Sequence, residues 1–255
     1  MPHSPARLAP PDPVHPAMWK IEDRDTTIFL FGTFHALDGS THWFKDRVRT
    51  AFQASDQLVL ETLVPRPQAR LAPANWPLSI GRSSVLAQPA SFAASTQLVL
   101  NAGRRRGMSP GNGADAALRM AAEGSGKPVG ALESFEFQIN MFSSLRAPAQ
   151  PQPQAQAQDP NVMKALAIAL AQLQDAWVRG DMATFAPMLE QMRAQTPQAY
   201  RTMFVERNAR WASWIAGRMR EPGTVFVAVG AGHLAGSDSV QNQLAAIGVG
   251  TTRIN

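Results

Sequence analysis

Short apolar runs alternate with amphipathic stretches along this chain, a pattern typical of strands alternating with helices. Residues 18–21 and 26–31 are rich in β-forming side chains and flank a polar four-residue turn, so they predict a β-hairpin. Residues 225–229, Val-Phe-Val-Ala-Val, are apolar at every position, which predicts a strand covered on both faces. Further strands are predicted at 57–60, 128–132 and 249–254.

Apolar residues at three- and four-residue spacing predict amphipathic helices between these strands. One helix, at about 198–219, carries the stripe Tyr200, Phe204, Arg207, Trp211 and Trp214. The other helices are predicted from about Thr41 and at 114–123, 162–177 and 182–194.

Capping residues mark the ends of two more helices. Ser134 is placed to cap a helix that starts at Phe135. Ser237 or Asp238 is placed to cap the last helix, which Gly248 ends. The whole pattern predicts an α/β (or α+β) fold, with a central mixed sheet flanked by helices.

Two stretches offer no apolar face to bury. Residues 1–16 are Pro-rich and lack the apolar region of a signal peptide, so we interpret them as a disordered leader. Residues 147–158 contain only Ala, Pro and Gln, and we expect a flexible insert over 147–160. Candidate site residues lie on both sides of this insert. We therefore predict a single domain over 17–255, interrupted by the insert.

Composition excludes several classes of protein. With 255 residues, 45% apolar and 17% charged, the chain can bury a sizeable core and is not mainly disordered. The net charge of +5 is scattered apart from the arginines at 104–106, so we expect no nucleic-acid partner. The absence of Cys excludes disulfides, iron–sulfur clusters and a thiol nucleophile. No apolar run is long enough to predict a membrane span.

Two histidines follow predicted strands through the same short motif. His35 and His233 each end a Gly-x-x-His sequence, after the strands at 26–31 and 225–229. The carboxyl ends of parallel strands form the ligand crevice of open α/β sheets. Hydrogen-bonded structural histidines are the alternative interpretation. A third such motif ends at His42, which we interpret as a surface histidine at a helix start.

Two glutamates occupy equivalent places. Glu61 and Glu133 directly follow the predicted strands at 57–60 and 128–132. Two imidazoles and two carboxylates at one edge of a sheet predict either a metal site or a set of general acids and bases.

Arg207 lies on an apolar helix stripe, so it should face the core. A buried arginine keeps its proton and needs a carboxylate or an anionic ligand nearby. The alternatives are an arginine whose charged end extends to solvent along its apolar stem, or a structural pair with Glu61 or Glu133. Asn208 is its neighbour in sequence.

Five segments together resemble the TraB/PrgY/GumN family, which is related to the TIKI metalloproteases. They occur in the family's order and span most of 18–254, while residues 63–100 match poorly. The segments are WKIEDRDTTIFLFGTFHAL (19–37), LVLET (58–62), PVGALESFEFQINMF (128–142), VERNARWASWI (205–215) and VFVAVGAGHLAGSDSV (225–240).

This resemblance implies a fold like that of erythromycin-esterase and ChaN-like proteins, with an inserted helical segment. It implies a site in which His35 and His233 bind a divalent ion and Glu61 is either the third ligand or the base that deprotonates the attacking water. The resemblance implies manganese or cobalt, and His and carboxylate ligands also suit zinc. We expect a hydrolase acting on a peptide or ester bond. Export to the periplasm is favoured, because GumN-like proteins are often exported.

Roles for the companion residues follow from the same resemblance. His35, Glu61, His233 and Arg207 form the expected catalytic set, and Arg207 would hold a substrate carboxylate or the developing oxyanion. The expected substrate-binding residues are Arg207, Asn208 and Glu133. Two alternatives stay open at this stage. One is a metal-free hydrolase that uses a His–Glu pair, and the other is a protein that binds a small ligand, a peptide or haem without turnover.

Overall fold

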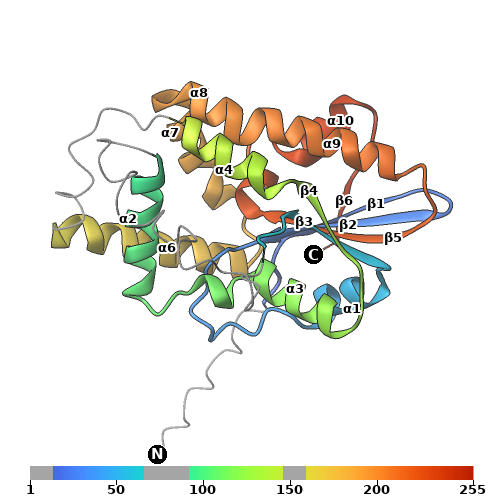
Figure 1. The fold of residues 1–255 in the computed structure, drawn as a ribbon, viewed down its shortest axis with the longest axis horizontal. Coiled ribbons are helices and arrows are strands. Elements are labelled where there is room, and N and C mark those ends of the chain that lie inside the picture. Colours follow the sequence, from blue (N-terminus) through green and yellow to red (C-terminus); the bar gives the residue numbers. More distant parts are fainter. Residues whose placement is uncertain (1–13, 66–91, 146–158, 255) are drawn as a thin grey trace, which may run out of the picture.

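The structure is a computed structural model that describes residues 14–65, 92–145 and 159–254. In these residues, six strands form one mixed sheet in the order β4-β3-β5-β2-β1-β6 (Figure 1). The four strands β4, β3, β5 and β2 are parallel, whereas β1 is antiparallel to both β2 and β6. The strands are β1 Met18–Glu22, β2 Thr26–Thr33, β3 Gln57–Thr62, β4 Val129–Glu133, β5 Gly223–Gly230 and β6 Thr252–Arg253.

Helices cover both faces of this sheet, which makes it an α/β fold as predicted (Figure 1). The helices are α1 Asp46–Ala54, α2 Phe92–Arg104, α3 Ala114–Gly124, α4 Phe135–Ser144, α6 Pro160–Val178, α7 Ala186–Gln195, α8 Pro197–Tyr200, α9 Glu206–Arg218 and α10 Val240–Ala246. Short 3₁₀ turns lie at η2 Pro110–Asn112, η3 Ala183–Phe185 and η5 Ala231–Leu234.

Strand β5 explains why its sequence is apolar at every position. Phe226 and Ala228 face a core shared with α1, α3 and α6, whereas Val225 and Val227 face a core shared with α9 and α10. All four are at most 1% exposed. Burial of one such side chain contributes about 1.5–3 kcal/mol. The centre of the sheet is therefore a rigid base for the residues that follow its strands.

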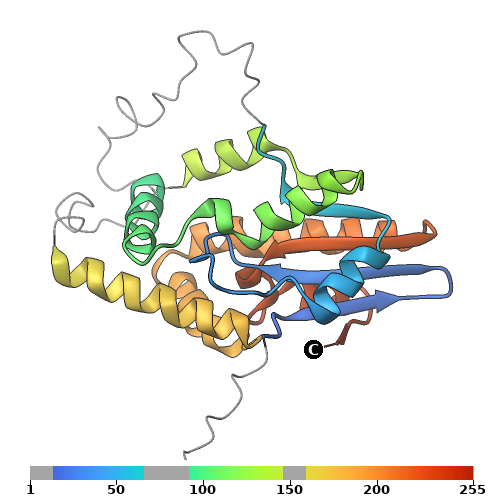
Figure 2. The ribbon, with the colours of Figure 1, turned by 90° about the horizontal axis from the view of Figure 1, so that it is seen from below.

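Helix α6 crosses the end of the sheet and packs against α2 (Figure 2). Its buried Trp177 donates the indole N–H to the carbonyl of Gly32 at 2.7 Å. Gly32 is the penultimate residue of β2, so this contact anchors the helical layer at the carboxyl edge of the sheet.

The predicted hairpin, the helices at 114–123 and 162–177 and the Ser134 cap are confirmed; the Ser134 hydroxyl accepts the N–H of Phe137 at 3.1 Å. The predicted helix start at Thr41 is wrong, because α1 begins at Asp46. The preceding loop is held irregular by Trp43, which is buried and stacks on Phe31 with ring centroids 5.6 Å apart.

The predicted cap of the last helix is also wrong. Ser239 is the N-cap residue of α10, and the Asp238 carboxylate instead accepts a hydrogen bond from the Tyr200 hydroxyl at 2.8 Å. Gly248 does follow the helix with a φ of +82°, a conformation that favours glycine. The last strand is shorter than predicted, since β6 comprises two residues.

The predicted leader and insert fall mainly outside the described residues. At their described ends, the chain is ordered. The N–H of His15 donates to the carbonyl of Val178 at 2.7 Å, and Asp159 caps α6 through the N–H of Asn161. Within the described ranges, no helix is long and apolar enough to cross a membrane.

Candidate functional site

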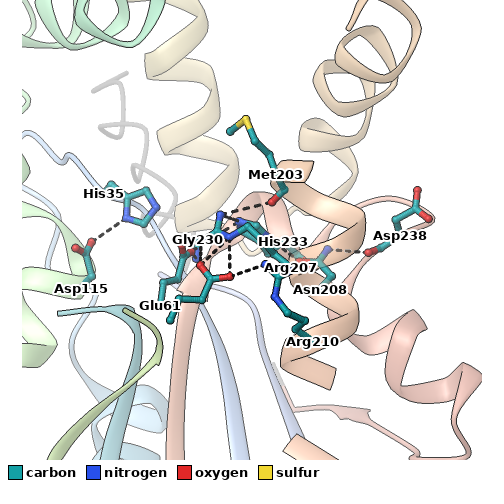
Figure 3. Close-up of polar contacts among 11 residues, drawn as sticks. His35, Glu61, Asp115, Met203, Arg207, Asn208, Arg210, Gly230, His233 and Asp238 are labelled. Atoms are coloured by element: carbon teal, nitrogen blue, oxygen red, sulfur yellow. Dashed lines mark hydrogen bonds and ion pairs between the residues drawn. The ribbon is translucent and has the colours of Figure 1, made fainter. Parts of the chain in front are cut away.

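The four predicted histidine and glutamate residues lie at the carboxyl edge of the parallel strands. Figure 3 shows three of them, His35, Glu61 and His233. His35 lies two residues beyond β2, and His233 lies in the turn η5 that follows β5. Glu61 and Glu133 do not follow their strands as predicted but belong to them. The β3–β4 ladder continues to Thr62 and Glu133, which keeps both carboxylates on regular backbone.

Arg207 on α9 joins the two glutamates and is 2% exposed. Its Nε donates to Glu133 Oε2 at 2.9 Å, and its Nη2 lies 2.9 Å from both Glu61 Oε2 and Glu133 Oε2. Its Nη1 contacts His233 Nε2 at 3.3 Å and the carbonyl of Met203 at 3.5 Å. All three nitrogens of the guanidinium therefore have partners within the protein. Arg207 thus holds Glu61 and Glu133 together through buried ion pairs. This is the structural pairing that the sequence offered as an alternative role.

A π-helical turn at Arg201–Val205 precedes α9 and was not predicted from the sequence stripe. Such turns add a residue to one helical turn and are frequent at functional sites. Here the turn is followed by Arg207 and Asn208, which are adjacent in sequence and both buried. Arg207 reaches the edge of the sheet, while Asn208 reaches the loop before α10.

The Glu61 carboxylate is ionised and almost completely buried. Its Oε1 accepts the backbone N–H of Gly230, and its Oε2 accepts the Arg207 hydrogen bond. Burial raises its pKa, but the charge of His233, once this ring is protonated at acidic pH, and the charges of Arg207 and His35 lower it more, to about 2. A carboxylate with so low a pKa is ionised at neutral pH and is a poor proton acceptor.

His233 is neutral, and its tautomer is fixed. Its Nδ1 lies 2.6 Å from Asn208 Oδ1, and the Asn208 amide nitrogen donates to the carbonyl of Asp238 at 2.7 Å. Asn208 therefore presents its oxygen to His233, which must carry its proton on Nδ1. Burial beside the rings of Phe204 and Trp211 lowers the pKa of His233, and the charge of Arg207 adds to this, to about 3. The Nε2 lone pair thus faces the site.

His35 differs from His233 in exposure and charge. Its side chain is 62% exposed, and its Nδ1 lies 3.1 Å from Asp115 Oδ1 at the start of α3. The hydrogen bond and charge of Asp115, together with the charge of Glu61, raise the pKa of His35 above its ordinary value. Sequence reasoning missed Asp115, because no motif or spacing relates it to His35.

Two side chains of the site lie close to the backbone of Gly230. A Cβ added there would lie 2.9 Å from His35 Nε2 and 3.1 Å from Glu61 Oε1. Both atoms therefore border the same small space above the end of β5, and His233 Nε2 lies 3.9 Å from the same Glu61 oxygen. The structure thus turns one nitrogen of each histidine and one oxygen of Glu61 toward a common region.

The comparisons with known proteins identify the family of this chain. Residues 17–84 and 68–253 match the model of the TraB/PrgY/gumN family, which covers most of the chain. The chain belongs to this family. No curated protein and no solved structure matches it. The likeness to erythromycin-esterase and ChaN-like proteins therefore stays a prediction.

The divalent ion that the sequence resemblance implies would find suitable types of donor here. Imidazole nitrogen and carboxylate oxygen suit manganese, cobalt and zinc. Both histidines also have an oxygen acceptor at Nδ1, as metal-bound histidines usually do. In the part of the chain that the structure describes, however, no three His, Asp or Glu side chains are grouped so that they would hold an ion. Binding would require Arg207 to leave His233 Nε2 and the exposed His35 ring to move.

The substitution Gly230→Ala should disturb the site more than the fold. Its added methyl group would push His35 Nε2 and Glu61 Oε1 apart, and the exposed His35 ring can yield. We expect a large loss of ligand binding or activity and a cost in stability of about 1–3 kcal/mol. Gly217→Ala, where an added Cβ meets nothing within 4 Å, is the matched control. Equal function in both variants would contradict this geometry.

The metal-free protein should lose stability as the pH falls below 6.5. The folded pKa of His233 is about 3, against an ordinary 6.5, so the unfolded chain binds a proton first. Its contribution to stability is complete above pH 6.5 and is lost toward pH 3. Glu61 adds a loss between pH 4.5 and about 2. Urea denaturation as a function of pH measures this, and His233→Gln should flatten the slope between pH 3 and 6.5; an unchanged slope would contradict a neutral buried ring.

Proposed function

We propose that this TraB/PrgY/gumN protein is a metal-dependent hydrolase that cleaves a peptide or ester bond. The observation that carries the proposal is the arrangement of the two Gly-x-x-His histidines. Each has its Nδ1 next to a protein oxygen, and each turns its Nε2 toward ionised Glu61. This is the outer-shell pattern of metal-bound histidines, in which the second nitrogen is fixed so that the first can bind.

The charge of each residue determines its role in this proposal. Neutral His233 and anionic Glu61 would hold the ion, and His35 would complete the set after losing its Nε2 proton. When bound, a divalent ion lowers the pKa of water and polarises a carbonyl group. Arg207 keeps Glu61 ionised, and Glu133 positions Arg207 from its other side. Because its donors are engaged within the protein, Arg207 would reach a substrate only by releasing one of these partners.

A second candidate, a metal-free hydrolase, is favoured by one specific contact. Arg207 Nη1 donates to His233 Nε2 at 3.3 Å and so engages the lone pair that a metal would need. In this alternative, His35, paired with Asp115, would accept the proton of the attacking water as a general base.

Hydrolysis of a panel of peptides and esters, with and without chelator, tests the proposal. We expect chelation to abolish activity and Mn²⁺, Co²⁺ or Zn²⁺ to restore it. His35→Ala and His233→Ala should each lower activity by about 100-fold or more. His42→Ala is the matched control, since this exposed histidine ends the third Gly-x-x-His motif. Activity that survives chelation would favour the metal-free alternative, and binding without cleavage would favour a binding protein.

A further inference from the structure

We propose that Asp115 is the positioning residue of His35, and that the segment before α3 is part of the site. The benefit of fixing His35 rests on the proposed function, in which this ring binds a ligand. The contact between Asp115 and His35 does not depend on that function. The segment includes the turn Gly111-Asn112-Gly113, which lies next to the backbone around His35.

The first observation is the contact itself. Asp115 Oδ1 lies 3.1 Å from His35 Nδ1, on the side of the ring opposite Nε2. A carboxylate accepts but does not donate, so Asp115 requires the His35 proton on Nδ1. The Nε2 lone pair of the neutral ring then faces the space above Gly230 and Glu61. Asp115 thus does for His35 what Asn208 does for His233.

The second observation is that backbone hydrogen bonds join the residues around His35 to the segment 109–115. Ala114 donates its N–H to the carbonyl of Phe34 at 2.9 Å, and Ser109 donates to the carbonyl of Leu37 at 2.9 Å. These bonds lie on either side of His35. They hold the residue and the start of α3 in one fixed relation.

The third observation is the close approach at Gly113. A Cβ added there would lie 2.3 Å from the carbonyl oxygen of His35 and 2.8 Å from its carbonyl carbon. These are backbone atoms that cannot turn away, so only glycine fits. Asp115 follows two residues later and is brought beside the imidazole by this contact.

The exposure of the pair argues for positioning rather than for stability. The side chains of His35 and Asp115 are 62% and 38% exposed, and exposed ion pairs contribute little to folding because water screens them. Removal of Asp115 should therefore leave the fold in place and free the ring to rotate or to change tautomer.

Imidazole ¹⁵N NMR of the metal-free protein, at a pH where the ring is neutral, tests the proposal directly. In the wild type we expect the His35 proton on Nδ1. Asp115→Ser should lose this tautomer, because the serine suits the start of a helix but is too short to reach the ring. Asp115→Asn keeps an oxygen acceptor and should retain it in part. Glu123→Gln, which removes the partner of Arg119 near the other end of α3, should change nothing.

The second readout is Mn²⁺ affinity, measured by calorimetry. Loss of an outer-shell partner typically lowers metal affinity about 10–100-fold, and we expect this loss for Asp115→Ser but not for Glu123→Gln. An Asp115→Ser protein whose His35 keeps its proton on Nδ1 would overturn the proposal. If the wild type binds no Mn²⁺ but the tautomer still depends on Asp115, the proposed function fails and the positioning role stands.

Discussion

Arg207→Met should lower the free energy of unfolding by about 3–5 kcal/mol, the usual effect of removing one partner from a buried ion pair. Arg207 is 2% exposed and is the cation that contacts both Glu61 and Glu133. Methionine fills much of the same volume but leaves two carboxylates buried, with only the half-exposed Arg210 near Glu133. Urea denaturation at neutral pH measures the loss.

Two further variants separate this effect from a general loss of packing. Arg119→Met removes a more exposed pair on α3 and should cost less than about 1 kcal/mol. The double variant Arg207→Met/Glu133→Gln should recover part of the loss, because it removes one uncompensated charge. A cost below about 1 kcal/mol for Arg207→Met alone would contradict a buried ionic cluster.

Glu61→Gln should lower hydrolytic activity by about 100- to 10,000-fold while the protein stays folded. Glutamine has the shape of glutamate, but its amide cannot accept from both Gly230 N–H and Arg207 Nη2. In the variant, the glutamine NH₂ group would face either the Gly230 N–H or Arg207 Nη2, which is also a donor. The negative charge beside His233 would be lost. Steady-state kinetics on the best substrate of the hydrolysis panel measures the effect.

A matched variant is available for this change as well. Glu221→Gln removes an exposed carboxylate that lies 3.8 Å from Arg218, away from the site. It should retain wild-type kinetics. If Glu61→Gln retained more than about a tenth of the activity, Glu61 would be neither a ligand nor a base in the reaction.

The fold was largely predictable because its signals are local. The β5 run is apolar at every position, and the hairpin of β1 and β2 needs only a short polar turn. Helix boundaries were less predictable. Trp43 holds the residues before α1 in an irregular loop, and Asp238 bonds Tyr200 instead of capping α10. Both outcomes depend on partners far away in sequence.

The site was predictable where strand ends or helix spacing point to it. His35 and His233 follow strands, and Arg207 stands out as a charge on an apolar stripe. Asp115 and the tautomer set by Asn208 were not predictable, because each depends on a contact between segments 25–80 residues apart. The sequence also could not show that all three guanidinium nitrogens of Arg207 have partners inside the protein.

Calorimetric titration of the metal-free protein with Mn²⁺ tests the central claim most directly. We expect the wild type and His42→Ala to bind the ion at a single site and to release protons, because His35 must give up a proton to bind. His233→Ala and Glu61→Gln should lose this binding. If the wild type binds no divalent ion, or if His233→Ala binds it as tightly as His42→Ala, the two Gly-x-x-His histidines and Glu61 do not form a metal site.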